Sequence, residues 1–384
     1  MREKLSNLFR LIAISLIPTI LIWILFFFRV KSFWKIPLPT DGMATIVANY
    51  DGPLYLVVAK TLYQKSLVGN FSFTLPAEYY AAHFPLFPLA IRAVAPLLGF
   101  PYSMLFITLI SSILAIYFFN KFISDYIDKK NLLWLTFAFA LFPARWLAVR
   151  SVGSAEPLFI AAIIASVYYF KQEKYLSSGI WGAIATLTKS PGILLFIAYF
   201  LTIFVPYFTQ SVTKDVSKNQ NFNLLRYTPL LVIPAALLAV FGFYKIQMND
   251  FFAYFHSGDN IHLFFPPFQI FNYSAPWVGT YWLEEIIFVY LISFLGLSRL
   301  INKKDKVVSW VTGVFLVTLL FVSHRDLVRY SLPIIPFLFA GFSDYLVKKE
   351  FKYAMVLIII PIFLYSLAFI SNNVMPISDW APLL

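Results

Sequence analysis

Long apolar runs without a charged side chain constrain this fold more than any other feature. The run from Leu11 to Phe28 carries no charge, and similar runs recur along the chain, of which only 12% of residues are charged. A soluble domain carries about 25%. Backbone groups in hydrocarbon need internal partners, so a chain that crosses a membrane forms helices or a closed barrel. Unbroken runs such as Tyr353–Ile360 lack the alternation of a barrel strand. The sequence therefore predicts an all-α polytopic membrane protein.

The apolar segments predict how often the chain crosses the membrane. A crossing needs roughly 20 apolar residues, and about eleven segments approach that length. They centre on residues 8–28, 102–120, 132–149, 156–170, 176–189, 192–208, 228–246, 283–300, 307–322, 331–346 and 353–371. Residues 84–98 contain three prolines and Arg92, which favours an amphipathic helix lying along the membrane surface. No soluble domain or linker is evident, so residues 1–384 are expected to form one transmembrane domain.

If these segments cross the membrane one after another, the basic loops fall on one side and the polar residues with potential chemistry on the other. Short loops with residues such as Lys171, Lys214, Lys218 and Lys348 fall on one side, as expected of the cytoplasmic side. The outer side receives two long loops, at about 29–101 and about 247–282, and all four His residues. We expect a multi-pass protein of the plasma membrane or endoplasmic reticulum with its active site on the outer or lumenal side. The net charge of +12 reflects this orientation rather than nucleic-acid binding.

Cofactor signals are weak in this sequence. The absence of cysteine excludes thiol catalysis and Cys-ligated metals. His256 and His262 are six residues apart, which does not place them together on a helix. Neither a phosphate-binding glycine loop nor a His-Glu-x-x-His helix is present. The sequence assigns no metal ligands and no particular cofactor, and it leaves a divalent metal open.

Asp51 is the principal candidate for chemistry. It lies in the first outer loop, directly before the Gly52-Pro53 break, which ends one short helix or begins another. A carboxylate there can act as a general base that takes the proton of an acceptor hydroxyl. Asp just ahead of a Pro in the first helical turn is equally typical of a helix N-cap. Both roles stay open, and they are compatible.

Arginines on the outer side are candidates for binding phosphate. Arg145 and Arg150 end one predicted span, and Arg325 and Arg329 share a face if their segment is helical. Arginines are usually more frequent in cytoplasmic loops, so the predicted place of these four on the outer side calls for another explanation. A guanidinium group binds phosphate through its planar fork. The alternatives are a surface pairing such as Arg325 with Asp326, or contact with lipid headgroups.

Three more polar residues have both a functional and a structural interpretation. Glu156 lies at the mouth of an apolar span, where ionisable groups are usually functional, yet it also suits the dipole of a helix start. Lys189 can contact a phosphate or balance a helix C-terminus. His83 can hydrogen-bond a sugar or a phosphate, or occupy a structural position at the start of a helix.

Five short motifs follow one another along the chain, and their order is informative. They are Tyr50-Asp51-Gly52-Pro53-Leu54-Tyr55, Phe84-Pro85-Leu86-Phe87-Pro88-Leu89, Ala155-Glu156-Pro157-Leu158-Phe159, Leu187-Thr188-Lys189-Ser190-Pro191-Gly192 and His324-Arg325-Asp326-Leu327-Val328-Arg329-Tyr330-Ser331-Leu332-Pro333. In order and spacing, this set resembles the PIG-V-type mannosyltransferases of the GT-C superfamily of membrane glycosyltransferases. Tyr50 stands where Trp is common, Pro53 is unusual, and Lys189 replaces a more frequent Arg. The anchor-synthesis substrate of that family is therefore not carried over.

The resemblance implies a GT-C-like bundle of about eleven transmembrane helices, with short amphipathic helices in the long first outer loop. It implies inverting transfer of a sugar, mannose in that family, from a polyprenyl-phosphate donor such as dolichyl-phosphate mannose. The acceptor would be a lipid, a glycan or a protein, with membrane lipids around the site. Asp51 would take the place of the catalytic aspartate. The candidate substrate-binding residues are Tyr50, Tyr55, His83, Arg145, Arg150, Glu156, Lys189, His324, Arg325, Asp326, Arg329 and Tyr330.

The sequence leaves other functions open, among them a structural subunit, which the number of polar groups on the outer face disfavours. A second is a different GT-C transferase, acting on protein or on a lipid of the lipid-A type, which would share the loop carboxylate. A third is a non-enzymatic transporter of lipids or solutes. A transporter needs ionisable groups near mid-membrane, whereas those of this chain gather at one face.

Overall fold

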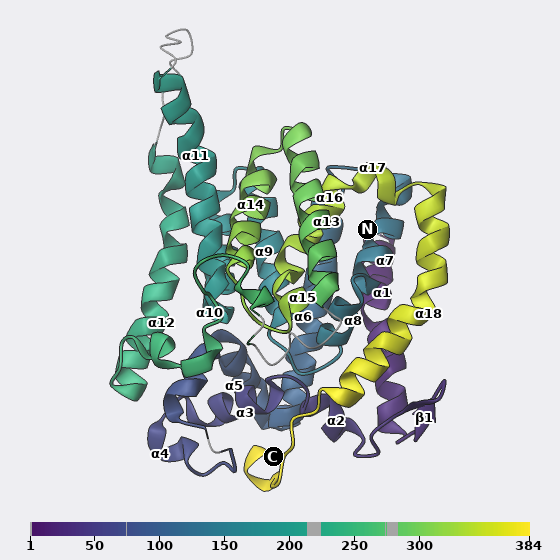
Figure 1. Ribbon diagram of the computed structural model, residues 1–384, viewed down its shortest axis with the longest axis vertical. Helices are drawn as coiled ribbons and strands as arrows, with labels where there is room; N and C mark the ends of the chain where they lie inside the picture. The colour runs from purple at the N-terminus through teal and green to yellow at the C-terminus, as the bar shows by residue number, and fades with distance from the viewer. Residues whose placement is uncertain (1, 74, 213–223, 273, 275–282) are drawn as a thin grey trace.

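The computed structural model describes residues 2–73, 75–212, 224–272, 274 and 283–384, and it is almost entirely helical (Figure 1). In this described part, the only sheet is a hairpin of two-residue strands, β1 (Ser32–Phe33) and β2 (Ile36–Pro37). The strands are antiparallel, with Ser32 opposite Pro37 and Phe33 opposite Ile36. The prediction of an all-α chain is confirmed for these residues.

Four helices among the described residues are long and apolar enough to cross a membrane. They are α1 (Arg2–Phe27), α6 (Phe100–Ile123), η4 (Leu224–Leu231) continued by α12 (Val232–Met248), and α18 (Lys349–Asn372). A fifth crossing results if α7 (Lys129–Leu141) and α8 (Ala144–Arg150), bent by 73° between them, count as one. Pro143 lies at this bend, where proline cannot continue the hydrogen-bond ladder. By length and composition, these helices indicate a multi-pass membrane protein.

The predicted count of about eleven crossings is not met. Each predicted segment contains a helix, but α9 (Glu156–Lys171), α10 (Tyr175–Thr188) and α14 (Lys306–Leu320) have only 16, 14 and 15 residues. At about 1.5 Å per residue, such helices fall short of a hydrocarbon core about 30 Å thick. The remaining predicted segments hold η2 (Ser190–Ile193), α11 (Leu194–Val212), α13 (Leu283–Asn302), η8 (Leu332–Ile334), α16 (Ile335–Gly341) and α17 (Ser343–Leu346). Among them, α11 and α13 have 19 and 20 residues, and the other helices are shorter; hydropathy alone does not distinguish such shorter helices from full crossings.

Helix α9 forms the centre of the bundle, packed between α6 and α10. Its small residues Ala161, Ala162 and Ala165 are fully buried, which lets neighbouring helices approach closely. On α10, a Cβ atom at Gly179 would lie 2.3 Å from the Pro229 carbonyl oxygen, so only glycine allows this approach to η4. Glu156, the first residue of α9, is itself buried.

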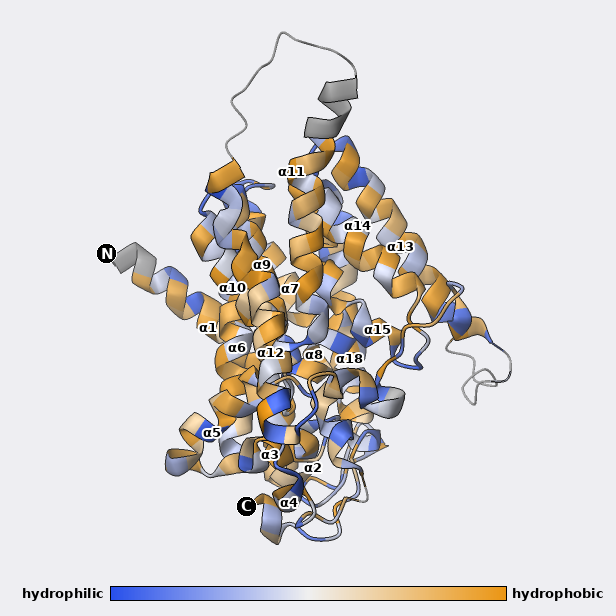
Figure 2. Cartoon of the chain, turned by 90° about the vertical axis from the view of Figure 1, so that its left-hand side faces the viewer, coloured by the Kyte–Doolittle hydropathy of each residue, from blue (hydrophilic) through white to orange (hydrophobic). Residues whose placement is uncertain are grey.

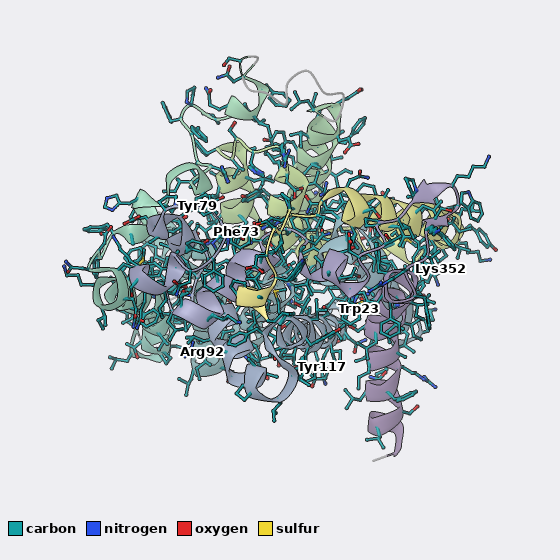
Figure 3. All side chains as sticks on the ribbon, turned by 90° about the horizontal axis from the view of Figure 1, so that it is seen from below. Trp23, Phe73, Tyr79, Arg92, Tyr117 and Lys352 are labelled. Carbon is teal, nitrogen blue, oxygen red and sulfur yellow. The ribbon has the colours of Figure 1, made fainter. Side chains whose placement is uncertain are left out.

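The first long loop contains the short helices that the sequence predicts for it. They are α2 (Met43–Val47), α3 (Gly52–Thr61), α4 (Lys65–Val68), η1 (Ala77–Ala82) and α5 (Leu86–Leu98). Helix α5 buries Phe87 and Ile91 on one face and exposes Leu97 and Leu98, consistent with the predicted amphipathic helix over 84–98. These helices gather at one end of the molecule with β1 and the C-terminus (Figure 1). Seen from that end, Phe73 and Tyr79 lie on the side away from α1 (Figure 3).

The second long loop and the C-terminal segment cover the same end. The loop forms η5 (Ala253–His256), η6 (Gly258–Asn260) and η7 (Gln269–Phe271), and η5 and η6 pack against η1. Residues 273 and 275–282 of this loop, like Lys214 and Lys218 of a predicted inner loop, lie outside the described residues. Hydrophilic residues are prominent around α3 and α4, whereas the long helices are largely apolar (Figure 2).

After α18, the chain crosses the first loop and ends in η9 (Ala381–Leu383). Val374 pairs with Asn49 in an antiparallel bridge, and the Met375 N–H donates to the Ala48 carbonyl at 2.7 Å. The buried Asn49 side chain donates to the Ile370 carbonyl at 2.7 Å and accepts from the Asn373 amide at 3.3 Å. The segment that carries Asp51 is thus held by the C-terminal part of the chain.

Candidate active site

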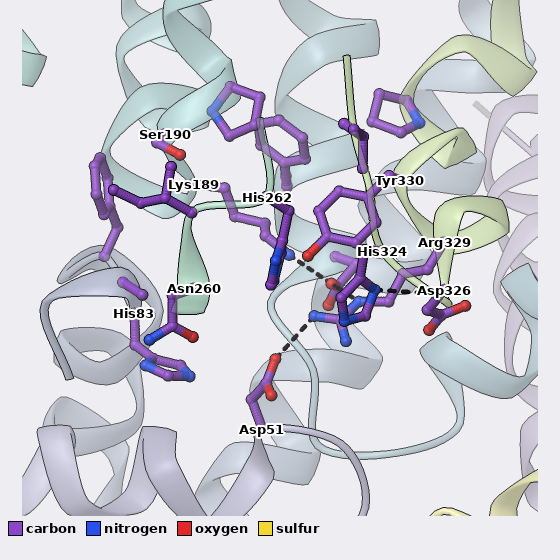
Figure 4. Close-up of a pocket in the computed structure, with 18 of the residues that line it drawn as sticks. Asp51, His83, Lys189, Ser190, Asn260, His262, His324, Asp326, Arg329 and Tyr330 are labelled. Atoms are coloured by element: carbon purple, nitrogen blue, oxygen red, sulfur yellow. Dashed lines mark hydrogen bonds and ion pairs between the residues drawn. The ribbon is translucent and has the colours of Figure 1, made fainter. Parts of the chain in front are cut away.

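A cavity of about 760 Å³ lies between the two loops and the ends of α9, α12 and α14. That volume is within the usual range of ligand pockets. The cavity is lined by most of the predicted site residues: Tyr50, Asp51, Tyr55, His83, Glu156, Lys189, His324, Arg325, Asp326, Arg329 and Tyr330. Arg145 and Arg150 do not line it. Residues from both halves of the sequence therefore meet in one place (Figure 4).

The Asp51 carboxylate faces this cavity rather than its own helix. Its backbone carbonyl accepts from the Tyr55 N–H at 2.9 Å, at the start of α3, but its side chain makes no capping hydrogen bond. Oδ2 of Asp51 instead accepts from Nη2 of Arg329 at 2.8 Å, and 34% of the side chain is exposed. Asp51 occupies the N-cap position with its backbone only, which leaves the carboxylate available to a substrate.

Arg329 connects the two central carboxylates. Arg329 lies on the short helix α15 (Leu327–Tyr330), just before η8. Its Nε donates to Oε1 of Glu156 at 2.6 Å. Its guanidinium also lies 4.6 Å from the centre of the Tyr50 ring. A buried charge that loses its partner is strongly destabilising. The three charged groups therefore form one interdependent unit.

Glu156 brings two cations together. Its side chain is only 7% exposed, and Oε1 accepts from Nζ of Lys189 at 2.5 Å as well as from Arg329. The Ser154 hydroxyl donates to the other carboxylate oxygen. Because Glu156 begins α9, the helix dipole also favours its negative charge. The structural interpretation is thus supported, and Glu156 also holds Lys189 and Arg329 at the cavity.

Arg145 lies behind the cavity wall. Its Nη1 is 3.0 Å from the Tyr50 hydroxyl and 3.3 Å from Oδ1 of Asp326, and its guanidinium lies 3.8 Å from the Phe369 ring centre. Asp326 therefore pairs with Arg145, and the surface pairing with Arg325 considered above is not the one formed. Arg145 thus contacts two residues that line the cavity, Tyr50 and Asp326, without lining it itself.

Arg150 is placed away from the site, contrary to the expectation that it binds substrate. Its side chain is fully buried, with Nε donating to the Ala140 carbonyl at 3.0 Å and Nη1 to the Ser15 carbonyl at 2.8 Å. These bonds tie α8 to α7 and α1. Arg145 and Arg150 are five residues apart on α8, which at 3.6 residues per turn places them on different faces of the helix and in different surroundings.

Burial and neighbouring charges shift the protonation of the cavity groups. Burial acts to raise the pKa of Asp51, but Arg329 and His83 outweigh it and hold that pKa below its usual value. Burial lowers the pKa of His83, against the opposing influence of Asp51. Burial, assisted by His262, lowers the pKa of His324 to about 3. At neutral pH, Asp51 is ionised and both histidines are uncharged.

Several lining residues were not singled out from the sequence as site residues. They are Tyr79, Ser190, Tyr254, Asn260 and His262. The His262 ring lies 4.3 Å from that of His324, whereas His256 is an exposed partner of Asp250, with Nδ1 and Oδ2 2.6 Å apart. The shared outer placement of the histidines was the only sequence signal for this pair. Within the described ranges, no group of three His, Asp or Glu residues is placed to hold a metal ion.

Comparison with solved structures shows which known folds this chain resembles. ArnT from Cupriavidus metallidurans bound to undecaprenyl phosphate matches with a TM-score of 0.54 and 12% identity, over 89% of this chain and 62% of ArnT. Archaeal oligosaccharyltransferase AglB from Archaeoglobus fulgidus, in complex with an inhibitory peptide and a dolichol-phosphate, matches with a TM-score of 0.49 and 12% identity. That match covers 96% of this chain and 57% of AglB. No protein-family model and no curated protein matches the sequence. The chain spans 62% of the ArnT length and resembles ArnT in fold.

Proposed function

We propose that this protein is an integral membrane glycosyltransferase that uses a sugar carried on a polyprenyl phosphate. One observation carries the proposal: an ionised carboxylate, Asp51, shares a cavity with Lys189, Arg325 and Arg329. A base and phosphate-binding cations are the groups that such a transfer needs. The fold shared with ArnT, a protein whose structure contains undecaprenyl phosphate, supports a lipid-phosphate donor. Mannose as the sugar rests on the motif resemblance.

The cations would hold the phosphate of the donor. In the donor, this phosphate is a diester with one negative charge. When the bond from C1 of the sugar to the phosphate oxygen breaks, its electron pair stays on the phosphate, which gains a second negative charge. Cations already fixed by Glu156 stabilise this charge without reorganising during the reaction.

Asp51 would act as the general base. The acceptor oxygen attacks C1 while its proton passes to Asp51, and polyprenyl phosphate leaves from the opposite face of the sugar. A single displacement of this kind inverts C1. The ion pair with Arg329 makes Asp51 a weak base in this structure. A donor phosphate competes for Arg329, so donor binding raises the proton affinity of Asp51 when it is needed.

The apolar part of the cavity would receive the beginning of the prenyl chain. Ile160, Leu194, Leu237, Phe315 and Leu319 line it beside the charged groups. A donor with a lipid tail satisfies both surfaces, whereas a nucleotide sugar would leave the apolar wall uncovered. In the membrane, the cavity would lie on the outer or lumenal side, with some of the shorter helices completing the bundle.

Donor preference tests this function. Purified full-length chain is incubated with polyprenyl-phosphate mannose, polyprenyl-phosphate glucose or GDP-mannose, and release of polyprenyl phosphate or GDP is measured. We expect consumption of a lipid-phosphate donor only, and a loss of at least tenfold in kcat/KM for Lys189→Met. Lys245→Met is the matched control, because Lys245 is exposed on α12 and does not line the cavity. Consumption of GDP-mannose alone would contradict the proposal.

A further inference from the structure

We infer that one side of the cavity is an acceptor subsite for an uncharged, hydroxyl-bearing carbohydrate. This neutral lobe consists of Tyr55, Tyr79, His83, Ser190, Tyr254 and Asn260, all of which line the cavity. The inference rests on the proposed function and adds the chemical class of the acceptor. In Figure 4, His83, Ser190 and Asn260 lie on one side of Asp51, and Asp326, Arg329 and Tyr330 lie on the other.

The neutral lobe is one built surface, because its parts contact one another. The Asn260 amide donates to the Tyr79 carbonyl at 3.3 Å, which joins the second loop to the first. The Ser190 and Tyr254 hydroxyl oxygens are 3.0 Å apart. The Tyr55 ring meets the His83 ring edge-on, with 5.0 Å between their centres. A ligand here would meet groups that are already held in place.

Charge distinguishes the two sides of the cavity. Burial lowers the pKa of His83, so none of the six side chains of the neutral lobe carries a charge at neutral pH. Lys189, Arg325 and Arg329 lie among the remaining lining residues. A phosphate is attracted to those cations. Lys189 adjoins Ser190, but its Nζ is paired with Glu156, so the side chains of the neutral lobe themselves offer an anion no counter-charge. The two substrates are therefore sorted by charge.

The chemistry of the neutral lobe matches a sugar. Hydroxyl groups of a sugar both donate and accept hydrogen bonds, as imidazole, amide and hydroxyl side chains do. The C–H faces of a sugar ring pack on aromatic rings, of which this lobe has three from tyrosine. His83 is only 5% exposed, and its Nδ1 has no hydrogen-bond partner in the described part of the chain. Its backbone is fixed by the Tyr63 hydroxyl, which donates to the His83 carbonyl at 2.6 Å.

The position of the lobe suits inverting transfer. The incoming hydroxyl and the departing phosphate must lie on opposite faces of C1. His83 and Asp51 line the same cavity, and the Tyr55 ring that meets the His83 ring belongs to α3, which Asp51 directly precedes. A hydroxyl held by the neutral lobe would thus approach with Asp51 beside it and the phosphate-binding cations beyond.

Two product channels test the subsite separately from the function. Polyprenyl-phosphate mannose is supplied with octyl α-mannoside as the neutral acceptor probe, and both water hydrolysis of the donor and transfer to the probe are measured. For His83→Phe and Asn260→Ala, we expect the KM for octyl mannoside to rise about tenfold each, so that the ratio of transfer to hydrolysis falls whatever the rate of donor hydrolysis. His256→Phe and Asn249→Ala are matched controls, because both residues are exposed and outside the cavity. They should leave both channels at the wild-type level.

The contrary results are distinct. An unchanged KM for octyl mannoside in both lobe variants, with donor hydrolysis intact, would overturn the subsite and leave the function standing. Transfer only to a serine peptide or to a phosphorylated glycoside would overturn the acceptor class. Absence of any donor turnover would contradict the proposed function itself. Saturation-transfer NMR with octyl mannoside then tests the lobe without turnover: a signal lost in Asn260→Ala and kept in Asn249→Ala supports it, and equal signals overturn it.

Discussion

Arg329 Nη2 lies 2.8 Å from Asp51 Oδ2, although the two residues are 278 positions apart. The same guanidinium holds Glu156 through Nε at 2.6 Å. The proposed base and a phosphate-binding cation are therefore parts of one network. Whatever binds one of these groups changes the others.

Replacing Arg329 should damage stability and activity together. In Arg329→Ala, Glu156 and Asp51 lose the cation that they share. The largely buried Glu156 then has Lys189 as its one remaining cationic partner among the described residues. We expect a loss of about 3 kcal/mol in the free energy of unfolding, measured by chemical denaturation in detergent, and loss of donor turnover. Arg325→Ala is the control for stability, because Arg325 is exposed at the cavity. Equal stability of the two variants would show that the network is not a unit.

Arg150 should matter for folding and not for substrate binding. Arg150→Lys loses the hydrogen bonds that reach the Ala140 and Ser15 carbonyls, so we expect a loss of about 1–3 kcal/mol in stability. Donor KM of the folded fraction should stay at the wild-type value, because Arg150 does not line the cavity. A raised donor KM at unchanged stability would restore Arg150 to the site.

Asn49 should act as a positioning residue for Asp51. Asn49→Ala removes the bonds to Ile370 and Asn373 that hold the segment before Asp51. We expect kcat to fall about tenfold while donor KM changes little, because the cations are untouched. Asn49→Gln should not restore the rate, since its longer side chain does not fit a fully buried position. Asn70→Ala is the control, because Asn70 is exposed in the same loop. Equal kcat in Asn49→Ala and Asn70→Ala would contradict this role.

Stability should decline between about pH 6.5 and pH 4 because of His324. Its folded-state pKa is about 3, below the unfolded value of about 6.5, so in this range the unfolded chain binds the extra proton. In this range, the loss of stability as pH falls therefore comes from protonation of histidine in the unfolded chain. The lowered pKa of His83 acts in the same direction. Asp51, whose pKa is lowered, contributes a loss only below about pH 4.

The measurement for this pH effect is the unfolding midpoint of wild type and His324→Gln at several pH values. The variant should show a shallower decline, by up to about 1 kcal/mol per pH unit. His256→Gln is the matched control, because His256 is exposed. Parallel curves for wild type and His324→Gln would contradict the assignment.

The sequence predicted residues better than it predicted geometry. Glu156 was singled out because charge at the mouth of an apolar span is rare, Asp51 because it precedes the Gly52-Pro53 break, and Arg329 because basic residues are less frequent on the predicted outer side; all three line one cavity. Arg150 could not be separated from Arg145, because tertiary packing decides which face of α8 meets the cavity wall and which meets α1 and α7. Short buried helices such as α9 resemble membrane crossings in hydropathy, which inflated the count. Asn260 and Tyr254 were missed because the contact between the two loops has no local sequence signal.

The most direct test of the central claim is sugar transfer by Asp51→Asn. Asparagine keeps the size of the side chain but cannot take the acceptor proton, so transfer from a polyprenyl-phosphate sugar should fall by about 10²- to 10⁴-fold. Donor binding should persist, because Lys189, Arg325 and Arg329 remain, and Asp250→Asn, outside the cavity, should transfer at the wild-type rate. Wild-type transfer by a folded Asp51→Asn protein would contradict the account.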